Sequence, residues 1–149
     1  MITADEKTFE RGHGRANMRM IHARDPRQEI FERLGPVLGN IEVFHNQILV
    51  AIYVRPEKTA GGILLPDSQQ KEDVYQGKVG LVLKKGPLAF VNDARNDFAG
   101  QDVEVGDWIA YRAADGWLLN LSGASGKEAV RMLEDTHVKL RLTSPDDIW

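Results

Sequence analysis

Three consecutive aliphatic residues form the clearest candidate for a binding site in this chain: Ile63, Leu64 and Leu65. The run follows Gly61 and Gly62, precedes the sequence P-D-S at 66–68, and has polar residues on both sides. A core strand would alternate apolar with polar residues or continue for more than three residues. The glycines give the backbone conformational freedom, and the proline ends the run. The pattern predicts a binding loop that becomes ordered when it meets an apolar partner. The alternative interpretation is a buried edge strand.

Polar residues that could perform catalysis or bind a metal do not form recognisable motifs. The four histidines have no metal-ligand spacing with one another or with carboxylates: His13, His22, His45 and His137. The sequence G-A-S-G-K-E at 123–128 lacks the first glycine and the Ser or Thr that a phosphate-binding loop requires. Asp146 and Asp147 lie in a polar tail, where we expect them to be solvated. We therefore predict no catalytic residues, no metal site, no cofactor and no enzymatic activity.

The composition indicates a single soluble domain. The chain has 149 residues, of which 42% are hydrophobic, so it can build one core. A net charge of −3 does not favour binding to nucleic acid or to an anionic membrane. The absence of cysteine excludes disulfides and thiol chemistry, and no apolar run approaches the roughly 20 residues that span a bilayer. We expect a cytoplasmic protein.

A helix is predicted near the N-terminus, after a basic arm. Residues 11–24 contain four arginines, two histidines and no acid, which is typical of a mobile arm or of a contact with an acidic surface. Asp25 is a suitable N-cap, Pro26 suits the first helical position, and the pair at 35–36 (G-P) is a stop signal. Ile30, Phe31 and Leu34 would share one face, which is expected to dock on the rest of the chain or on a neighbouring subunit.

From residue 41 onward the pattern is that of strands. Residues 48–54 (I-L-V-A-I-Y-V) predict a strand buried on both faces, and 78–83 predict a second strand in which Gly80 marks a bulge or a close approach. Further strands are expected within 103–111, 117–121 and 138–142, with Asp115 and Gly116 as a hairpin turn. Many short strands separated by turns favour a small β-barrel.

The body of the chain resembles the GroES family of co-chaperonins over residues 41–142. The resemblance rests on four segments in chain order: I-E-V-F-H-N-Q-I-L-V at 41–50, similar to the opening strand of the family; E-K-T-A-G-G-I-L-L-P-D-S at 57–68, similar to its mobile loop; Q-G-K-V at 76–79; and V-G-D at 105–107. The loop motif is fairly specific, whereas the V-G-D turn alone is weak. Their shared order and spacing carry the comparison.

This resemblance implies a fold and a mechanism. It implies a mainly β protein, a small irregular GroES-like β-barrel at 41–142, with a mobile loop at about 55–76 and a roof-like segment at about 85–101. Residues 1–40 would be an N-terminal arm and short helix, and 143–149 a C-terminal tail. It also implies a heptameric ring that caps an ATP-driven GroEL-like chaperonin, with Ile63, Leu64 and Leu65 in a groove of the apical domain and Gly61 and Gly62 as hinges.

The chain also departs from the family pattern. About 40 residues precede the first expected strand, and a tail follows residue 142. Divergent members of this kind resemble those encoded by bacteriophages, which implies a location in the cytosol of a bacterium or of an infected host. Two functions therefore remain open: a chaperonin lid that assists protein folding, or a GroES-like barrel reused as a structural or adaptor protein, for instance in a viral particle.

Overall fold

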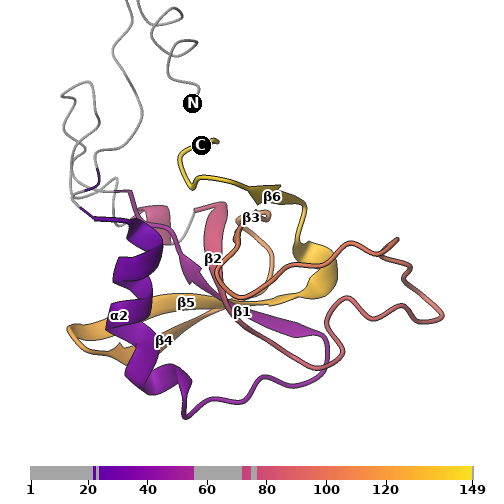
Figure 1. Ribbon diagram of the computed structural model, residues 1–149, viewed down its shortest axis with the longest axis horizontal. Helices are drawn as coiled ribbons and strands as arrows, with labels where there is room; N and C mark the ends of the chain where they lie inside the picture. The colour runs from indigo at the N-terminus through magenta and orange to yellow at the C-terminus, as the bar shows by residue number, and fades with distance from the viewer. Residues whose placement is uncertain (1–21, 23, 56–71, 75–76, 149) are drawn as a thin grey trace, which may run out of the picture.

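A computed structural model describes residues 22, 24–55, 72–74 and 77–148. The described residues form one six-stranded antiparallel sheet with one main helix on it (Figure 1). The elements are α2 (Pro26–Leu38), β1 (Gln47–Ile52), β2 (Val79–Lys85), β3 (Trp108–Ala110), β4 (Trp117–Gly123), β5 (Gly126–Glu134), the 3-10 helix η1 (Asp135–His137) and β6 (Leu140–Leu142). The strand order is β4-β5-β1-β2-β3-β6. The predicted fold class, mainly β with one helix in the N-terminal extension, is confirmed.

Strand β1 lies inside the sheet and is buried on both faces, as the apolar run at 48–54 predicts. It pairs with β2 along one edge and with β5 along the other. Leu49, Ala51 and Tyr53 enter one hydrophobic cluster, whereas Ile48 and Val50 enter a second cluster on the opposite face. Side chains of successive residues in a strand point to opposite faces, so this one strand supplies both cores. The strand begins at Gln47, not at residue 41 as the opening segment suggested, because His45 has φ 57 and turns the chain.

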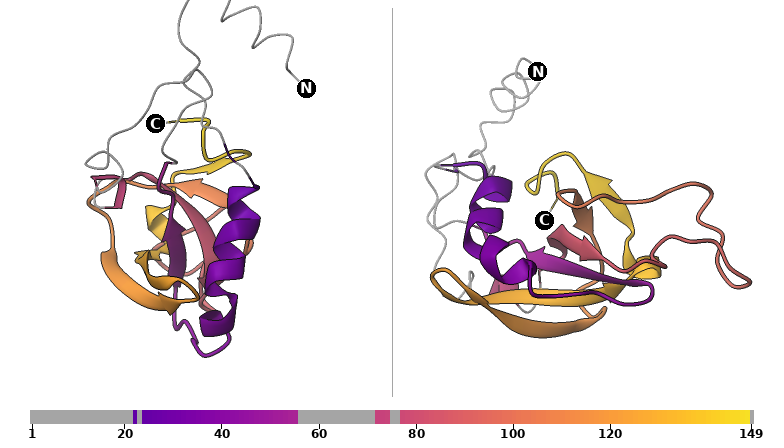
Figure 2. Two further views of the ribbon diagram at one scale, coloured as in Figure 1. Left: turned by 90° about the vertical axis from the view of Figure 1, so that its left-hand side faces the viewer. Right: turned by 60° about the horizontal axis from the view of Figure 1, so that its bottom comes forward.

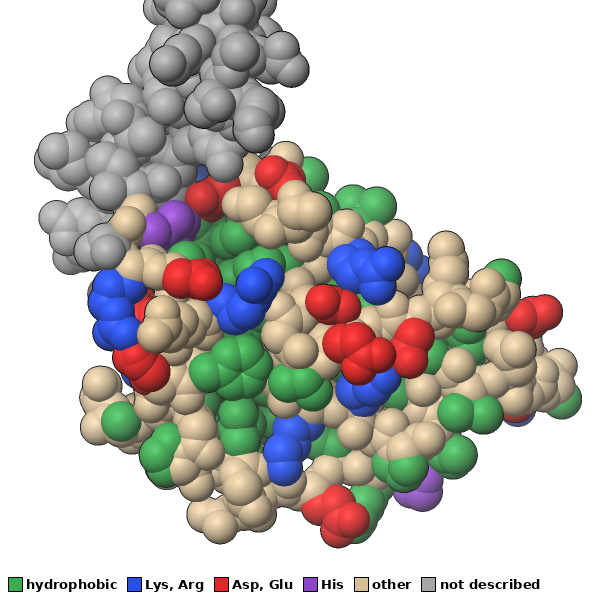
Figure 3. Space-filling view, viewed as in Figure 1, with side chains coloured by type: hydrophobic (Ala, Val, Ile, Leu, Met, Phe, Trp, Pro, Cys, Tyr) green, Lys and Arg blue, Asp and Glu red, His purple; other side chains and the backbone are tan. Residues whose placement is uncertain are grey.

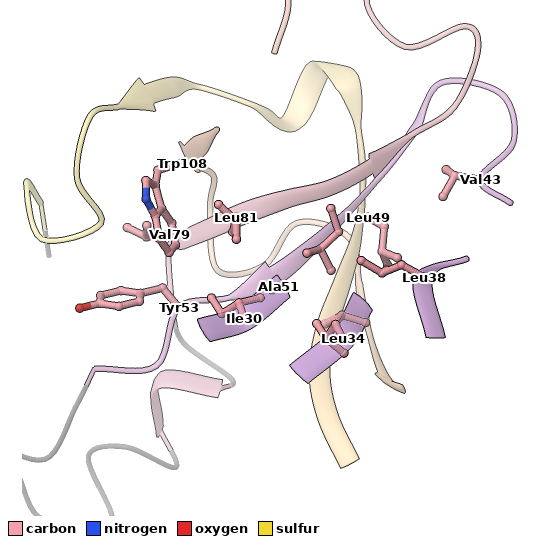
Figure 4. Close-up of a cluster of buried hydrophobic side chains, with 12 residues drawn as sticks. Ile30, Leu34, Leu38, Val43, Leu49, Ala51, Tyr53, Val79, Leu81 and Trp108 are labelled. Carbon is pink, nitrogen blue, oxygen red and sulfur yellow. The ribbon is translucent and has the colours of Figure 1, made fainter. Parts of the chain in front are cut away.

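Helix α2 packs on the sheet of its own chain. The Asp25 carboxylate accepts a hydrogen bond from the backbone N–H of Arg27 at 3.0 Å, and Pro26 begins the helix, as predicted. Ile30, Leu34 and Leu38 are buried in the larger hydrophobic cluster. Figure 4 shows this cluster extending from Trp108 and Tyr53 at one end to Leu38 and Val43 at the other. The helix therefore closes the core of the sheet, a choice that the sequence had left open.

The helix continues past its predicted stop at 35–36. Pro36 lies inside the last turn, and Gly39 is the C-cap. A proline inside a helix loses its N–H bond and crowds the carbonyl four residues earlier, which costs up to about 3 kcal/mol. Continuing the helix by two residues buries Leu38, which is 7% exposed, and burying a leucine contributes about 1.5–3 kcal/mol against that cost.

Strand β5 was not predicted, although it lies between β4 and β1. Its sequence, G-K-E-A-V-R-M-L-E, consists mainly of helix-forming residues, and its pairing on both edges overrides that preference. Its buried arginine, Arg131, donates to the backbone carbonyl of Asp115 at 2.6 Å. The turn at Asp115 and Gly116 is also not a hairpin turn, because it joins β3 to β4 and those strands are not neighbours. The β4–β5 hairpin instead turns at 123–126. This turn lies in the segment at 123–128 that lacks the residues of a phosphate-binding loop.

Two predicted glycine features are confirmed. A Cβ atom at Gly80 would lie 3.1 Å from the carbonyl oxygen of Ala51 and 3.1 Å from the ring of Tyr111, so the glycine permits a close approach. The V-G-D segment at 105–107 turns the chain into β3, with Gly106 at φ 98.

Shortening a buried side chain of α2 should destabilise the whole fold. Leu34 is 1% exposed, so Leu34→Ala removes buried methyl groups and leaves a cavity. We expect the free energy of unfolding to fall by about 2–5 kcal/mol, measured by denaturant titration.

The neighbouring residue provides the control. Gly35 is exposed, and a Cβ there would have no atom within 4 Å, so Gly35→Ala should raise stability by about 0.5–1 kcal/mol. A loss of less than about 1 kcal/mol in Leu34→Ala would contradict the packing of α2 on the sheet.

Candidate functional site

The residues predicted to contact a chaperonin lie outside the described residues: Gly61, Gly62, Ile63, Leu64 and Leu65. Their position and contacts therefore stay a prediction. The structure does describe both ends of the segment that carries them. The N-terminal end leaves β1 through Tyr53 to Arg55, and the C-terminal end enters β2 through residues 72–74 and 77–78.

A buried ion pair joins these two ends. The guanidinium of Arg55 donates to the carboxylate of Asp73 through two nitrogens, Nε to Oδ2 at 3.0 Å and Nη2 to Oδ1 at 2.8 Å. The backbone N–H of Arg55 donates to the same carboxylate at 3.0 Å. The side chain of Asp73 is 2% exposed and that of Arg55 is 10% exposed. The bidentate geometry and the burial make this pair stronger and more specific in direction than an ion pair on the surface.

Backbone contacts complete this arrangement, which we call the loop root (Arg55, Asp73 and Gly77). Residues 72–74 are helical, and the carbonyl of Asp73 accepts from the N–H of Gly77 at 2.8 Å. A Cβ at position 77 would lie 2.4 Å from that carbonyl oxygen, so the turn requires glycine. Tyr53 N–H donates to the carbonyl of Val79 at 2.9 Å, which extends the β1–β2 pairing to the loop root.

The loop root could not be predicted from the sequence. Arg55 follows the apolar run at 48–54, Asp73 ends the charged sequence K-E-D at 71–73, and nothing local marks either of them as buried. The available signal was their opposite charge at the two ends of the segment that contains the aliphatic tripeptide. A single sequence does not show that such charges pair.

A second polar cluster ties the N-terminal arm to the C-terminal tail; we call it the latch (His22, Tyr53 and Asp146). The hydroxyl of Tyr53 donates to Asp146 Oδ1 at 2.5 Å, and His22 Nε2 lies 3.0 Å from Asp146 Oδ2. Burial, followed by the hydrogen bond to the Asp146 carboxylate, raises the pKa of Tyr53 above its usual range, so its hydroxyl stays a donor. The prediction that Asp146 is simply solvated is wrong, because its side chain is 8% exposed and paired.

The segment at 86–101 extends away from the sheet on the side opposite α2 (Figure 2), and we call it the projecting segment. Buried Asp135 anchors its base by accepting from Phe90 N–H at 3.0 Å and from the Asn46 side chain at 3.2 Å. Phe90 and Phe98 pack edge to face with ring centres 5.3 Å apart. Figure 3 shows hydrophobic side chains spread over this part of the surface, and Leu88 and Val91 are 53% and 49% exposed.

The described residues contain no group of three or more His, Cys, Asp or Glu that could hold a metal ion. His22, His45 and His137 lie in the latch, in a turn before β1 and in η1, respectively. Within the described part of the chain, no helix has the length and apolar character needed to cross a membrane.

Comparison with known proteins identifies the family. The family model of the Chaperonin 10 Kd subunit matches residues 40–136. The chain belongs to this family. It is 33% identical over 79 residues to the co-chaperonin GroES of Pelagibacter ubique (strain HTCC1062), which covers 53% of this chain and 76% of that protein. It is 37% identical over 79 residues to co-chaperonin GroES 2 of Mesorhizobium japonicum, which covers 53% of this chain and 70% of that protein.

The match to the Chaperonin 10 family includes the predicted contact residues and the loop root but not α2 or the latch residues His22 and Asp146. Helix α2, His22 and Asp146 therefore lie outside the matched region and nevertheless pack on it, His22 and Asp146 through Tyr53. Both relatives are named as co-chaperonins rather than as enzymes. A bacteriophage origin and the predicted domain limits stay predictions.

The latch should contribute to stability in this Chaperonin 10 family member. Asp146→Asn removes a buried carboxylate and leaves the hydroxyl of Tyr53 with a weaker acceptor. We expect the free energy of unfolding to fall by about 1–3 kcal/mol. Asp147→Asn is the matched control, because Asp147 is exposed and bonds only to neighbouring residues 143 and 144 among the contacts of the described chain. Equal losses in the two variants, measured by thermal or denaturant unfolding, would contradict a latch.

Proposed function

We propose that this protein is a co-chaperonin that caps an ATP-driven chaperonin and assists protein folding. It docks Ile63, Leu64 and Leu65 into an apolar groove of the chaperonin's apical domain, with Gly61 and Gly62 as hinges. The observation that carries the proposal is the family match over 40–136, because that match contains the aliphatic tripeptide and the relatives are named as co-chaperonins.

The energetics of such docking favour several weak contacts. Burying three aliphatic side chains contributes about 1.5–3 kcal/mol each. Ordering the backbone of the segment costs about 1–2 kcal/mol per residue. One copy of the segment therefore binds weakly and dissociates readily. Several copies on one assembly bind tightly together, because each contact after the first is intramolecular.

A ring would supply those copies, and the sheet has edges that could form one. Among the described strands, β4 and β6 each pair on one side only. Trp117 and Leu118 on β4 and Leu140 on β6 are 57%, 37% and 50% exposed. Unpaired strand edges with exposed apolar side chains favour association with another copy. We propose a ring, with seven subunits as in the family, in which the projecting segment contributes to the roof.

Changing the tripeptide should abolish capture of the chaperonin. In the triple variant Ile63→Ser, Leu64→Ser, Leu65→Ser the apolar contact is lost, so we expect no retention on immobilised chaperonin in the presence of ADP or ATP. The control is Val105→Ser, which removes an exposed apolar group, 53% exposed, from the turn before β3. The control should be retained like the wild type.

Retention of the triple variant would contradict the docking role of the tripeptide. Absence of wild-type capture in every nucleotide state would contradict the co-chaperonin proposal. That result would favour the reuse of the barrel as a structural or adaptor protein.

The ring is tested on the free protein. We expect native mass spectrometry to give a seven-subunit mass and electron-microscopy averages to show sevenfold symmetry. A monomer at micromolar concentration would contradict the ring.

A further inference from the structure

We propose that the ion pair between Arg55 and Asp73 is a clamp that sets the length of the partner-binding segment and so positions Leu64. The inference rests on the proposed function, since it assigns positioning residues for the same contact. It concerns two residues outside the predicted contact set, Gly61 to Leu65.

The hydrogen bonds of Asp73 hold the two ends of the segment in a fixed relative position. Two guanidinium nitrogens and the backbone N–H of Arg55 converge on one buried carboxylate, within 2.8–3.0 Å. The same aspartate holds Gly77 through its carbonyl at 2.8 Å. Asp73 therefore connects the end of β1 to the approach to β2. The planar guanidinium restricts direction as well as distance, so the two chain ends are held in one relative orientation.

The position of the clamp along the chain matches the position of the tripeptide. Leu64 is nine residues after Arg55 and nine residues before Asp73, so it is the midpoint of the clamped segment. When both ends are held together, the midpoint is the residue that can lie farthest from the barrel. Nine extended residues reach about 30 Å.

Without the clamp, the midpoint changes. The next backbone hydrogen bond between the two sides, among the described residues, joins Tyr53 to Val79. The residue midway between those two positions is Pro66, not Leu64. The tripeptide would then lie off centre in a longer segment, and more residues would have to be ordered on binding. Both changes weaken the contact.

The test uses capture of the full-length protein by chaperonin in ADP, at a temperature where every variant is folded by unfolding measurements. Asp73→Asn removes the charge with little change of shape, and we expect about tenfold weaker capture, because a weakened contact is repeated in every subunit. The matched control is Asp115→Asn. Asp115 pairs with Arg112 through the same Nη2–Oδ1 distance, 2.8 Å, but closes a turn away from the partner-binding segment. Capture of the Asp115→Asn variant should equal that of the wild type.

A length change separates positioning from stability. Four residues inserted after Lys58 move Leu64 off the midpoint of the clamped segment but place it midway between Tyr53 and Val79. The insertion should therefore weaken capture of the wild type, but it should weaken capture of Asp73→Asn less, because centring Leu64 offsets part of the cost of the added length. An insertion that weakens both proteins alike, or unchanged capture of Asp73→Asn, would overturn the proposal.

A measurement on the free protein keeps the clamp testable if the wild type binds no chaperonin. The amides of Arg55 and Gly77 should exchange with solvent faster in Asp73→Asn, while the amide of Val82, bonded to Asp107 within the sheet at 2.9 Å, should not change. Unchanged exchange at Arg55 would overturn the clamp. Failure of capture alone, with faster exchange at Arg55, would overturn the proposed function and leave the clamp supported.

Discussion

Burial of β1 on both faces is the constraint on which the rest of this fold depends. The strand pairs along both edges, and its side chains alternate between two hydrophobic clusters. Its continuation ends at Tyr53 and Arg55, which belong to the latch and to the loop root. A strand that is fixed on four sides provides a rigid origin for both. The chain segment that begins at residue 56 therefore starts from a well-defined position.

The N-terminal extension contributes to the same core. Helix α2 lies outside the family match, yet Ile30, Leu34 and Leu38 belong to the cluster that contains β1. The latch adds a polar connection between residue 22, the end of β1 and the C-terminal tail. Helix α2 shares a hydrophobic cluster with Tyr53, and the latch contains Tyr53, so both reinforce the end of β1 from which the segment proposed to bind the chaperonin departs. This protein supports its barrel with material from both ends of the chain.

Features set by local sequence could be predicted, and features set by distant pairing could not. The apolar run of β1, the N-cap at Asp25 and the V-G-D turn follow from neighbouring residues, and all three are present. Strand β5 could not be predicted because its residues prefer helix, and only pairing with β1 and β4 selects the extended form. The end of α2 depended on burial of Leu38, which the G-P signal does not encode. For the candidate site, the tripeptide stays a prediction from the sequence, and neither the loop root nor the latch was predicted, since the side-chain contacts that form them join residues 18 or more positions apart.

We propose that the segment between Arg55 and Asp73 is the surface that meets the chaperonin, and that the described chain presents this segment. Amide hydrogen exchange of the full-length protein, with and without chaperonin and ADP, tests this claim most directly. The account predicts new protection at residues 61–65, with α2 and the projecting segment unchanged. Protection on α2 or the projecting segment, with none at residues 61–65, would contradict it.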